Sequence, residues 1–392
     1  MVLQILFFMI ITIVAIPVAV LVAQVFAALI YVKKPLNTHI NKSQNLTILM
    51  PAHNEALVIA KTINTLVPTV NSAQQILVVA DNCTDETADI SRNLGATVIE
   101  RQHSTLRGKG YALDYGLQHL KANPPEIVII IDADCLADAA AISTLAHACV
   151  AHQRPIQALY LMQMQTNPSL KQRIAAFAWV VKNHVRPLGF KVLGLPCQLM
   201  GTGMAFLWKD IAAVNLASGH IAEDMKLGVD LARLNKAPIF VPEALVTSEF
   251  PLDKNATKTQ RARWEHGHLS IIVSDAPSLF LEAIKTKNVQ MLGLAFDLIV
   301  PPLAVLVIVL VCVWLLGMLV YILTNNLTSF TYASLVFMFL FVAIMIAWGF
   351  FGKQIISLKQ LSYAPIYALA KIPLYIKFFV NRQLEWVRSK RD

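Results

Sequence analysis

The stretch Ile127-Val128-Ile129-Ile130-Ile131-Asp132-Ala133-Asp134 joins an unbroken β-branched run to two carboxylates. Continuous runs of this kind are typical of strands that are buried on both faces of a parallel sheet. Residues two apart on an extended backbone point the same way, so the two carboxylates should lie close together. Such anions repel each other unless a cation lies between them, and a hard divalent ion that also binds substrate phosphates would fit. A solvated turn is the alternative.

Similar apolar runs recur on both sides of this stretch. They predict strands at Leu46–Met50, Ile76–Ala80, Thr97–Ile99, Ile127–Ile131 and Ala158–Met164. The first four runs are each followed by turn or cap residues and then by a helix-like stretch. This alternation predicts an α/β domain over residues 40–285. Ligands of open α/β sheets bind beyond the carboxyl ends of the strands, so the polar residues at those ends are the candidates for function.

The composition of the 392-residue chain indicates a membrane protein. Hydrophobic residues make up 56% and charged residues 15%, whereas an average soluble chain has about 25% charged residues. Intrinsic disorder is excluded by the same figures. The net charge of +9 suits anionic partners such as phosphorylated substrates or the inner membrane face. Nucleic acid is not expected as a partner, because the basic residues cluster at membrane boundaries and in the candidate site.

Three apolar blocks are long enough to cross a bilayer, which takes about 20 residues. Residues 1–32 carry no charge and precede Lys33 and Lys34, so we expect an uncleaved helix with its N-terminus outside and the next domain in the cytoplasm. A cleaved signal peptide is the alternative, but it needs a basic start and a short apolar core. The blocks Met291–Leu323 and Phe330–Phe351 predict a helical hairpin over residues 290–352.

The last apolar segment, Leu361–Val380, is ambiguous because it contains two prolines and two lysines. If it crossed the membrane, the basic tail 381–392 would lie outside, against the positive-inside tendency. We therefore expect an amphipathic segment or a re-entrant one at the interface, with a span as the alternative. The five cysteines form no CxxC pair, which gives no disulfide framework and favours a reducing cytosolic side.

Polar residues follow the first two predicted strands. The sequence Pro51-Ala52-His53-Asn54-Glu55 could hold a nucleotide, or Asn54 could cap a helix with Glu55 on its dipole. Asp81 stands at the tip of the second strand, where its carboxylate could accept hydrogen bonds from a base or a ribose. Helix capping explains most of the run that follows it.

Two basic motifs suit a diphosphate. The loop Arg107-Gly108-Lys109-Gly110 opens a helix, and its glycines let the backbone approach a phosphate, but it lacks the P-loop spacing of a Walker-type ATPase. On a helix, Gln260 would share a face with Arg263 or Trp264. The arginine could neutralise phosphate charge and the indole could stack on a sugar ring. A basic membrane-surface helix is the alternative.

A second carboxylate pair, Glu223-Asp224, lies in the helix-like stretch Ile221–Leu234. Asp224 could act as a general base beside an acceptor hydroxyl. An ordinary first-turn pair is the alternative. The stretch Ser169–Pro196 predicts an interfacial helix near the acceptor entrance, with packing against the domain as its alternative.

Taken in order, these elements resemble the membrane-bound, processive-type members of glycosyltransferase family 2. That family includes cellulose, chitin, hyaluronan and poly-N-acetylglucosamine synthases, and also ceramide glucosyltransferase. The resemblance covers residues 45–267 and, more loosely, the flanking apolar segments. It implies a GT-A fold with a mixed, mainly parallel sheet, a nucleotide-diphosphate-sugar site, and Mg²⁺ or Mn²⁺ as the cofactor.

The resemblance also implies roles for individual residues. The catalytic pair is Asp224 and Glu223, in a Thr-Glu-Asp motif whose threonine is replaced by Ala222. The metal ligands are Asp134 and Asp132. The nucleotide and diphosphate contacts are Pro51, Ala52, Asn54, Glu55, Asp81, Lys109, Asp132, Gln260 and Arg263. The acceptor contacts are Gly201, Thr202, Gly203 and Trp264.

The implied function is inverting, metal-dependent transfer of a sugar from a UDP-linked donor to a growing exopolysaccharide at a bacterial inner membrane. Single-sugar transfer to a membrane lipid is the alternative, and three or four spans argue against a polymer channel within one protomer. Other polysaccharide-assembly or export proteins would be partners beside the bilayer. An alternative of another class is a non-catalytic membrane scaffold with a nucleotide-binding sheet.

Overall fold

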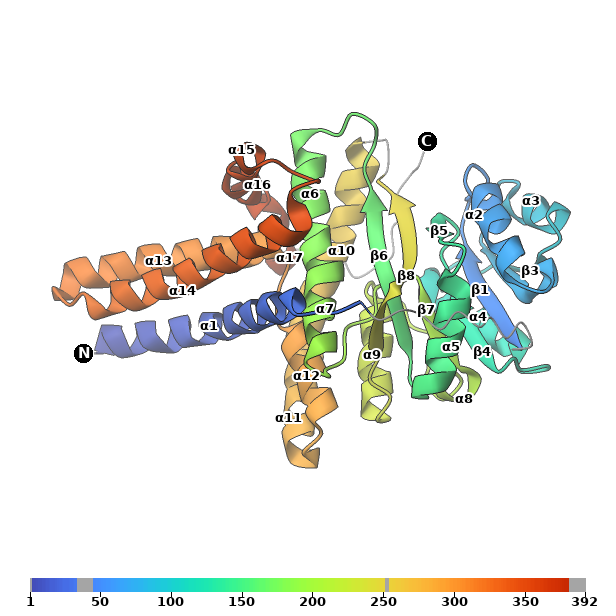
Figure 1. Ribbon diagram of the computed structural model, residues 1–392, viewed down its shortest axis with the longest axis horizontal. Helices are drawn as coiled ribbons and strands as arrows, with labels where there is room; N and C mark the ends of the chain where they lie inside the picture. Colours follow the sequence, from blue (N-terminus) through green and yellow to red (C-terminus); the bar gives the residue numbers. More distant parts are fainter. Residues whose placement is uncertain (1, 34–44, 251–253, 381–392) are drawn as a thin grey trace.

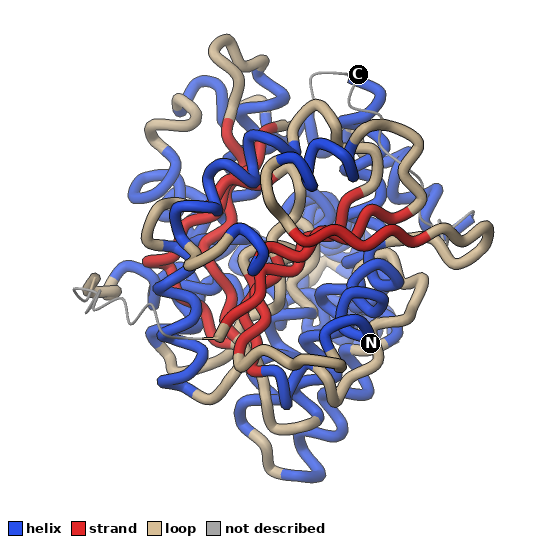
Figure 2. The backbone as a smooth tube through the Cα atoms, turned by 90° about the vertical axis from the view of Figure 1, so that its right-hand side faces the viewer, coloured by secondary structure: helices blue, strands red, loops and turns tan. Residues whose placement is uncertain are grey.

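The computed structural model describes residues 2–33, 45–250 and 254–380, without the side chains of residues 254–259 and 379. An eight-stranded mixed sheet has the order β3-β2-β1-β4-β7-β6-β8-β5. Figure 1 shows long helices projecting from one end of the molecule, and Figure 2 shows the strands as a central layer with helices on both sides. Lys34 and the predicted basic tail lie outside the described residues.

One half of the sheet is parallel and consists of β3 (Thr97–Arg101), β2 (Ile76–Asp81), β1 (Leu46–Ala52) and β4 (Ile127–Ile130). Alternate residues of these strands enter two different apolar layers. Leu49 and Ile130 pack with α4 (Lys109–Leu120), whereas Met50 and Ile129 pack in the layer of α2 (Ile59–Leu66) and α5 (Ala141–His152). Both faces are therefore buried, which is why the sequence runs are unbroken.

The other half makes the sheet mixed. It contains β7 (Met204–Leu207), β6 (Ile156–Gln163), β8 (Ile239–Glu249) and β5 (Cys135–Ala137). Strand β7 is antiparallel to both β4 and β6, β5 is antiparallel to β8, and β6 is parallel to β8. The sequence predicted β6 but missed the other three, because β5 and β7 are short and β8 contains Pro242, a residue that weakens a strand prediction.

A layer of helices lies between the sheet and the projecting helices, and runs across them (Figure 1). It consists of α6 (Leu170–Val180), the π-helical η3 (Val181–Val185), α7 (Arg186–Val192), α10 (Lys254–Ser274), α11 (Ala276–Thr286) and α12 (Val289–Leu298). The single helix predicted over Ser169–Pro196 is thus three consecutive segments. The other helices are α3 (Thr87–Asn93), α8 (Trp208–Ile211), α9 (Glu223–Arg233), η1 (Val67–Thr69), η2 (Ala73–Gln75) and η4 (Trp348–Gly352).

Three helices among the described residues are long and apolar enough to cross a membrane: α1 (Val2–Leu29), α13 (Leu303–Thr324) and α14 (Thr328–Ala347, continuing into η4). They pack side by side (Figure 1). The apolar block Met291–Leu323 is divided between α12 and α13, because Pro301 and Pro302 separate the two helices. After α14, the short helices α15 (Leu358–Leu361), α16 (Ala364–Leu369) and α17 (Ile372–Val380) are each too short to span.

A buried ion pair connects α1 to the helix layer. Arg186 Nη2 lies 2.9 Å from Asp297 Oδ1, and the two side chains are 3% and 2% exposed. Gln24 of α1 donates to the same carboxylate oxygen at 2.8 Å, and Gln198 donates to the other oxygen at 3.2 Å. At Gly189 a Cβ atom would lie 1.9 Å from the Gln24 carbonyl oxygen, so only glycine permits this helix contact. The N-terminal helix is therefore fixed to the loop that reaches the candidate site.

Candidate active site

Several separate segments converge on one cavity of about 210 Å³ at the carboxyl ends of β1, β2 and β4. The predicted site residues that line it are Pro51, Ala52, Glu55, Asp81, Lys109, Asp132, Asp134, Gly201, Glu223, Asp224, Gln260, Arg263 and Trp264. Residues that are up to 213 positions apart in the sequence thus face one space. If these motifs were only isolated helix caps and turns, their side chains would face solvent at separate places. Their roles remain predictions, but their convergence is a structural fact.

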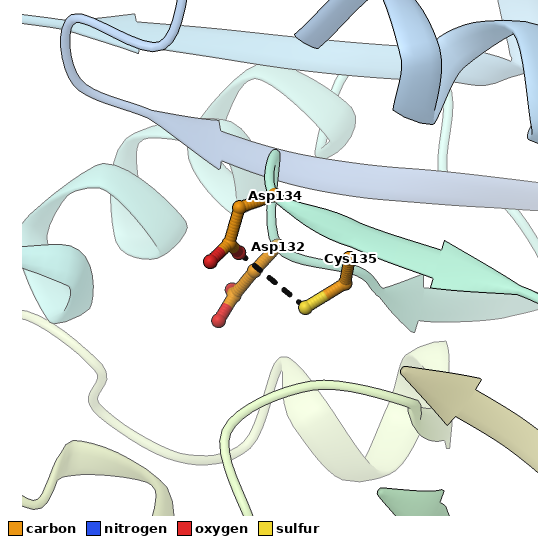
Figure 3. Close-up of side chains that lie close together, drawn as sticks. All are labelled: Asp132, Asp134 and Cys135. Carbon is orange, nitrogen blue, oxygen red and sulfur yellow. Dashed lines mark hydrogen bonds between the residues drawn. The ribbon is translucent and has the colours of Figure 1, made fainter. Parts of the chain in front are cut away.

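The turn between β4 and β5 carries the carboxylate pair, and Figure 3 shows Asp132 and Asp134 pointing the same way with Cys135 beside them. One ligand atom from each of the three residues lies within 4.8 Å of the others. Ser248 of β8 donates to Asp134 Oδ2 at 3.1 Å, and the Cys135 thiol lies 3.4 Å from Asp134 Oδ1. Burial and then the two carboxylates raise the pKa of Cys135 well above its ordinary value. The thiol therefore stays protonated, and the two carboxylates are the donors that suit a hard divalent ion.

Lys109, the first residue of α4, places a cation in the cavity. Its Nζ lies 2.5 Å from Asp132 Oδ1 and donates to the Gly201 carbonyl oxygen at 2.8 Å. Burial lowers the pKa of Lys109, but Asp132, Glu223 and Asp224 together raise it above its ordinary value. The side chain is thus a permanent cation beside the carboxylate turn, where a diphosphate could bind.

The loop at Gly201 brings the backbone close to the second carboxylate pair. Gly201 has φ +92°, and a Cβ atom there would lie 3.5 Å from Asp224 Oδ2 and 3.6 Å from Lys109 Nζ. Asp224 lies in the first turn of α9, and its Oδ1 accepts the backbone N–H of Met225 at 2.8 Å. The other oxygen of Asp224 is therefore the one on the side of the Gly201 loop.

Glu223 precedes Asp224 and behaves differently from an exposed carboxyl. Burial, and then the charge of Asp224, raise the pKa of Glu223 to about 7, although Lys109 and Arg263 act in the opposite direction. Ala222, which replaces the threonine of the family motif, gives α9 no side-chain cap. A Cβ atom at Gly267 of α10 would lie only 3.1 Å from the Ala222 Cβ, so α10 packs closely against this position.

Two of the predicted acceptor contacts, Thr202 and Gly203, lie away from the cavity. Thr202 is fully buried, and its Oγ1 accepts the backbone N–H of Asp132 at 3.1 Å. Gly203, with φ +65°, packs against β6, where a Cβ atom would lie 2.7 Å from the Ala158 Cβ. Neither residue lines the cavity. Thr202 therefore supports the backbone of Asp132 from behind the carboxylate turn, and the backbone N–H of Gly203 donates to the Ile130 carbonyl oxygen at 3.0 Å.

The residues predicted to contact a nucleotide line the cavity only in part. Asn54 does not line the cavity, and its Oδ1 accepts the backbone N–H of Thr84 at 2.7 Å, joining the loops after β1 and β2. Asp81 lines the cavity, but its Oδ1 already accepts bonds from Arg101 at 2.6 Å and Asn82 at 3.0 Å. Arg101 was missed, because nothing in the sequence around it shows that β3 places it beside Asp81.

An aromatic wall closes the side of the cavity that faces the helix layer. The rings of Trp264 and Trp179 are 4.9 Å apart, and those of Trp179 and Tyr160 are 5.4 Å apart at 85°. The indole N–H of Trp179 donates to the Tyr160 carbonyl oxygen at 3.1 Å. Tyr160 and the half-buried Lys182 also line the cavity, and neither was predicted as a site residue. The wall thus presents flat apolar rings to the cavity, a kind of surface on which a sugar ring could stack.

A mixed sheet with a paired-carboxylate turn over a cavity at its strand ends defines the GT-A class of glycosyltransferase fold. The chain belongs to Glycosyl transferase family group 2, whose model matches residues 127–351.

Several known proteins are similar to this chain. The probable glycosyltransferase YdaM of Bacillus subtilis is 24% identical over 269 residues, which cover 62% of this chain and 59% of YdaM, less than two thirds of its length. Protein RfbJ of Shigella flexneri is 35% identical over 98 residues, 25% of this chain and 70% of RfbJ. The solved mannosyltransferase PcManGT from Pyrobaculum calidifontis, in complex with GDP-mannose and Mn²⁺, has a TM-score of 0.54 and 16% identity, covering 94% of this chain and 99% of PcManGT. That likeness shows the shared fold.

Proposed function

We propose that this chain is a membrane-bound, metal-dependent, inverting glycosyltransferase that transfers a sugar from a UDP-linked donor to an acceptor hydroxyl. The observation that carries the proposal is the convergence of Asp132, Asp134, Lys109, Asp224 and Arg263 on one cavity. The three long apolar helices support a membrane location, and the cavity would then face the cytoplasm of a bacterial inner membrane. A non-catalytic scaffold would not need these groups around one space.

Asp224 is the general base of the proposed reaction. The acceptor hydroxyl oxygen forms a bond to the anomeric carbon while the bond from that carbon to the diphosphate breaks, and Asp224 takes the hydroxyl proton. The diphosphate leaves with the electron pair. One carboxylate suffices for inversion at the anomeric carbon. Glu223, whose pKa is about 7, keeps its proton in mildly acidic solution, and so adds no second negative charge beside the base there.

The leaving diphosphate develops negative charge, and fixed cations stabilise it. Lys109 and Arg263 line the same cavity as the carboxylate turn. The residues that would hold Mg²⁺ or Mn²⁺ are Asp134 and Asp132, and the ion would neutralise phosphate charge when bound. The similar fold of the mannosyltransferase solved with GDP-mannose and Mn²⁺ supports a nucleotide-diphosphate sugar as the donor and a divalent ion as the cofactor. The choice of UDP rests on the sequence resemblance.

The sequence resemblance favours a growing exopolysaccharide as the acceptor, with single-sugar transfer to a membrane lipid as the second candidate. The first would bring in other polysaccharide-assembly or export proteins as partners. The two differ in product length, which gel electrophoresis of the labelled product measures.

The decisive experiment measures nucleotide release by the purified full chain with a panel of UDP- and GDP-sugars, with and without EDTA. We expect release with one donor, loss of release in EDTA, and recovery with Mn²⁺ or Mg²⁺. The anomeric configuration of the product, read by NMR, should be opposite to that of the donor. Turnover that is independent of metal, or release from no donor at all, would contradict the proposal.

A further inference from the structure

A second cavity, of about 550 Å³, lies on the other side of the aromatic wall. It is enclosed by α6, α10, α13, α14 and α16, and shares Trp179, Lys182 and Trp264 with the polar cavity. Most of its other lining side chains are apolar, among them Phe177, Val307, Phe337, Leu340 and Ile344. Its volume falls within the roughly 300–1,000 Å³ that small-molecule sites occupy. A large apolar space therefore adjoins the candidate active site.

The apolar cavity reaches the surface that a bilayer would cover. Two of its walls are α13 and α14, both long enough to cross a membrane. Phe341 on α14 lines the cavity and is also 56% exposed, and Leu358 on α15 lines it and is 51% exposed. A hydrocarbon chain in the bilayer would therefore meet apolar side chains at the edge of the cavity.

Every charged side chain of this cavity has a polar partner among the described residues, with one exception. Arg186 forms an ion pair with Asp297 and Lys371 forms one with Glu265, whereas Arg261 donates to the neutral hydroxyl of Tyr367. Lys182 forms no ion pair or hydrogen bond with any described residue, and its Nζ lies 5.8 Å from the centre of the Trp179 ring.

Lys182 stands where the two cavities meet, as its place in both linings shows. Burial lowers the pKa of Lys182, although the charge of Asp224 opposes this, and both side chains line the polar cavity. A partly buried cation without a counter-ion is costly, and a ligand anion would relieve that cost. A phosphate group has the charge and the acceptor oxygens to do so.

We propose that the apolar cavity holds the acyl chains of an anionic phosphate lipid, with its phosphate at Lys182 and its headgroup hydroxyl beside Asp224 as the sugar acceptor. This inference rests on the proposed function, and of the two candidate acceptors it chooses the membrane lipid over the exopolysaccharide. The headgroup oxygen bonds to the anomeric carbon, the bond to the diphosphate breaks with its electron pair, and Asp224 takes the proton. A soluble polysaccharide would find few polar partners in the apolar cavity, and a neutral lipid would leave Lys182 without an anion.

Lipid binding to the full chain in detergent tests the proposal, with native mass spectrometry as the readout. Phosphatidylglycerol carries chains, a phosphate and free hydroxyls; diacylglycerol carries the chains and a hydroxyl; glycerol 1-phosphate carries only the headgroup chemistry. We expect phosphatidylglycerol to bind about tenfold more tightly than diacylglycerol, because it adds a charge-assisted contact. Glycerol 1-phosphate should bind far more weakly than either. Equal binding of the two lipids would overturn the role of Lys182.

Matched variants locate the site. Lys182→Met should abolish the preference for phosphatidylglycerol and Lys182→Arg should keep it, whereas Lys171→Met, on the exposed surface of α6, should change nothing. Ala304→Phe adds a ring inside the cavity and should weaken binding of both lipids. Leu315→Phe, at a position of α13 that is 53% exposed, is its control. Unchanged binding in Ala304→Phe would overturn the placement in this cavity.

Turnover separates this inference from the proposed function. With a labelled donor and native membranes, label should enter the chloroform-soluble fraction as an anionic product, and added phosphatidylglycerol should accept the label or compete. Label only in a water-soluble polymer would overturn the lipid acceptor and leave the glycosyltransferase intact. An effect of Lys182→Met on the KM for the donor, with lipid selectivity retained, would assign Lys182 to the diphosphate instead. Absence of nucleotide release from every donor would reject the proposed function itself.

Discussion

The polar cavity and the apolar cavity lie on two sides of one wall, but their charged groups are arranged in opposite ways. In the polar cavity, charges of both signs face one open space, and even the close pair Lys109 and Asp132 lines it. In the apolar cavity, Arg186 is neutralised by a partner from another helix, and so is Lys371. Lys182 lines both cavities, and it forms no ion pair with any residue that the structure describes.

This difference teaches how to distinguish charges that act on a ligand from charges that hold the fold. A buried charge is tolerated when a partner compensates it, and such a pair contributes to structure more than to chemistry. Charges that are held near one another around open space have perturbed pKa values and are candidates for function. Substitutions on the polar side should therefore change turnover, and substitutions of paired charges on the apolar side should change stability.

The largest effect is expected on the polar side, at Asp224. Asp224→Asn should lower the rate of sugar transfer roughly a thousandfold, because a general base contributes about 10²–10⁴-fold and an amide cannot take the proton. The same variant should keep its melting temperature within a few degrees. Nucleotide release under saturating donor measures the rate.

Asp230→Asn is the matched control for this change, because Asp230 lies on the same helix but pairs with Lys226 and Arg233 outside the cavity. Its rate should stay close to that of the unchanged chain. If Asp224→Asn retained full activity, the assignment of the base would be wrong. The claim that the charges of the polar cavity act in catalysis would then lose its main support.

The next effect is on stability, at the buried pair behind the apolar cavity. Asp297→Asn should destabilise the protein by roughly 3 kcal/mol, because it leaves the buried guanidinium of Arg186 without its anion. The melting temperature in detergent measures this loss. Glu249→Gln, which breaks an exposed pair with Lys61, should cost at most a few tenths of a kcal/mol. Equal losses in the two variants would contradict the structural role given to the buried pair.

The polar cavity was largely predictable from the sequence and the apolar cavity was not, for a physical reason. Asp132, Asp134 and Asp81 stand at or just after strand ends, and the topology of an α/β sheet brings strand ends together. Local patterns in the sequence are enough to find such residues. The walls of the apolar cavity come from helices that meet only after packing, and no local pattern shows which face of α6 will oppose α14.

The differences between the predicted and the observed cavity lining have the same origin. Thr202 and Gly203 were expected to contact the acceptor, but a sequence does not show which side of a loop faces the cavity, and here these residues face the sheet. Arg101 and Tyr160 were missed because each reaches the site through strand pairing far from the recognisable motifs. The parallel half of the sheet was predicted closely, since strands buried on both faces give unbroken apolar runs.

A smaller effect is expected for a substitution in the aromatic wall that the two cavities share. It sharpens the comparison because one residue of this wall contacts both cavities. Trp264→Leu removes a ring that lies tilted by 48° against Trp179 and lines both cavities. The aromatic pair that the variant loses contributes about 0.5–1.5 kcal/mol and holds the wall between the two cavities. We therefore expect a loss of about 1 kcal/mol in acceptor affinity, seen as a KM raised several-fold. Steady-state kinetics with varied acceptor measures it. A change confined to the KM for the donor would show that the indole serves only the polar cavity.

The smallest effect concerns pH and Glu223. Its folded-state pKa of about 7 lies above the ordinary value of 4.5, so between these values the folded protein binds more protons than the unfolded chain. The contribution of Glu223 to the free energy of unfolding is therefore complete below about pH 4.5, and this contribution is lost as the pH rises through 7. Because Glu223 is only half-buried, solvent screening should limit the change to roughly 1 kcal/mol.

Glu223→Gln isolates this contribution, because glutamine keeps the shape of the side chain and cannot ionise. The melting temperature of the unchanged chain in detergent, without donor or metal, should fall between pH 5 and pH 8 by more than that of the variant. Asp230→Asn provides the comparison for a carboxylate of the same helix that is paired with cations. Identical pH profiles for the unchanged chain and for Glu223→Gln would show that Glu223 is ionised throughout. Two negative charges would then flank the acceptor hydroxyl at every pH, and Lys109 and Arg263 would have to compensate both.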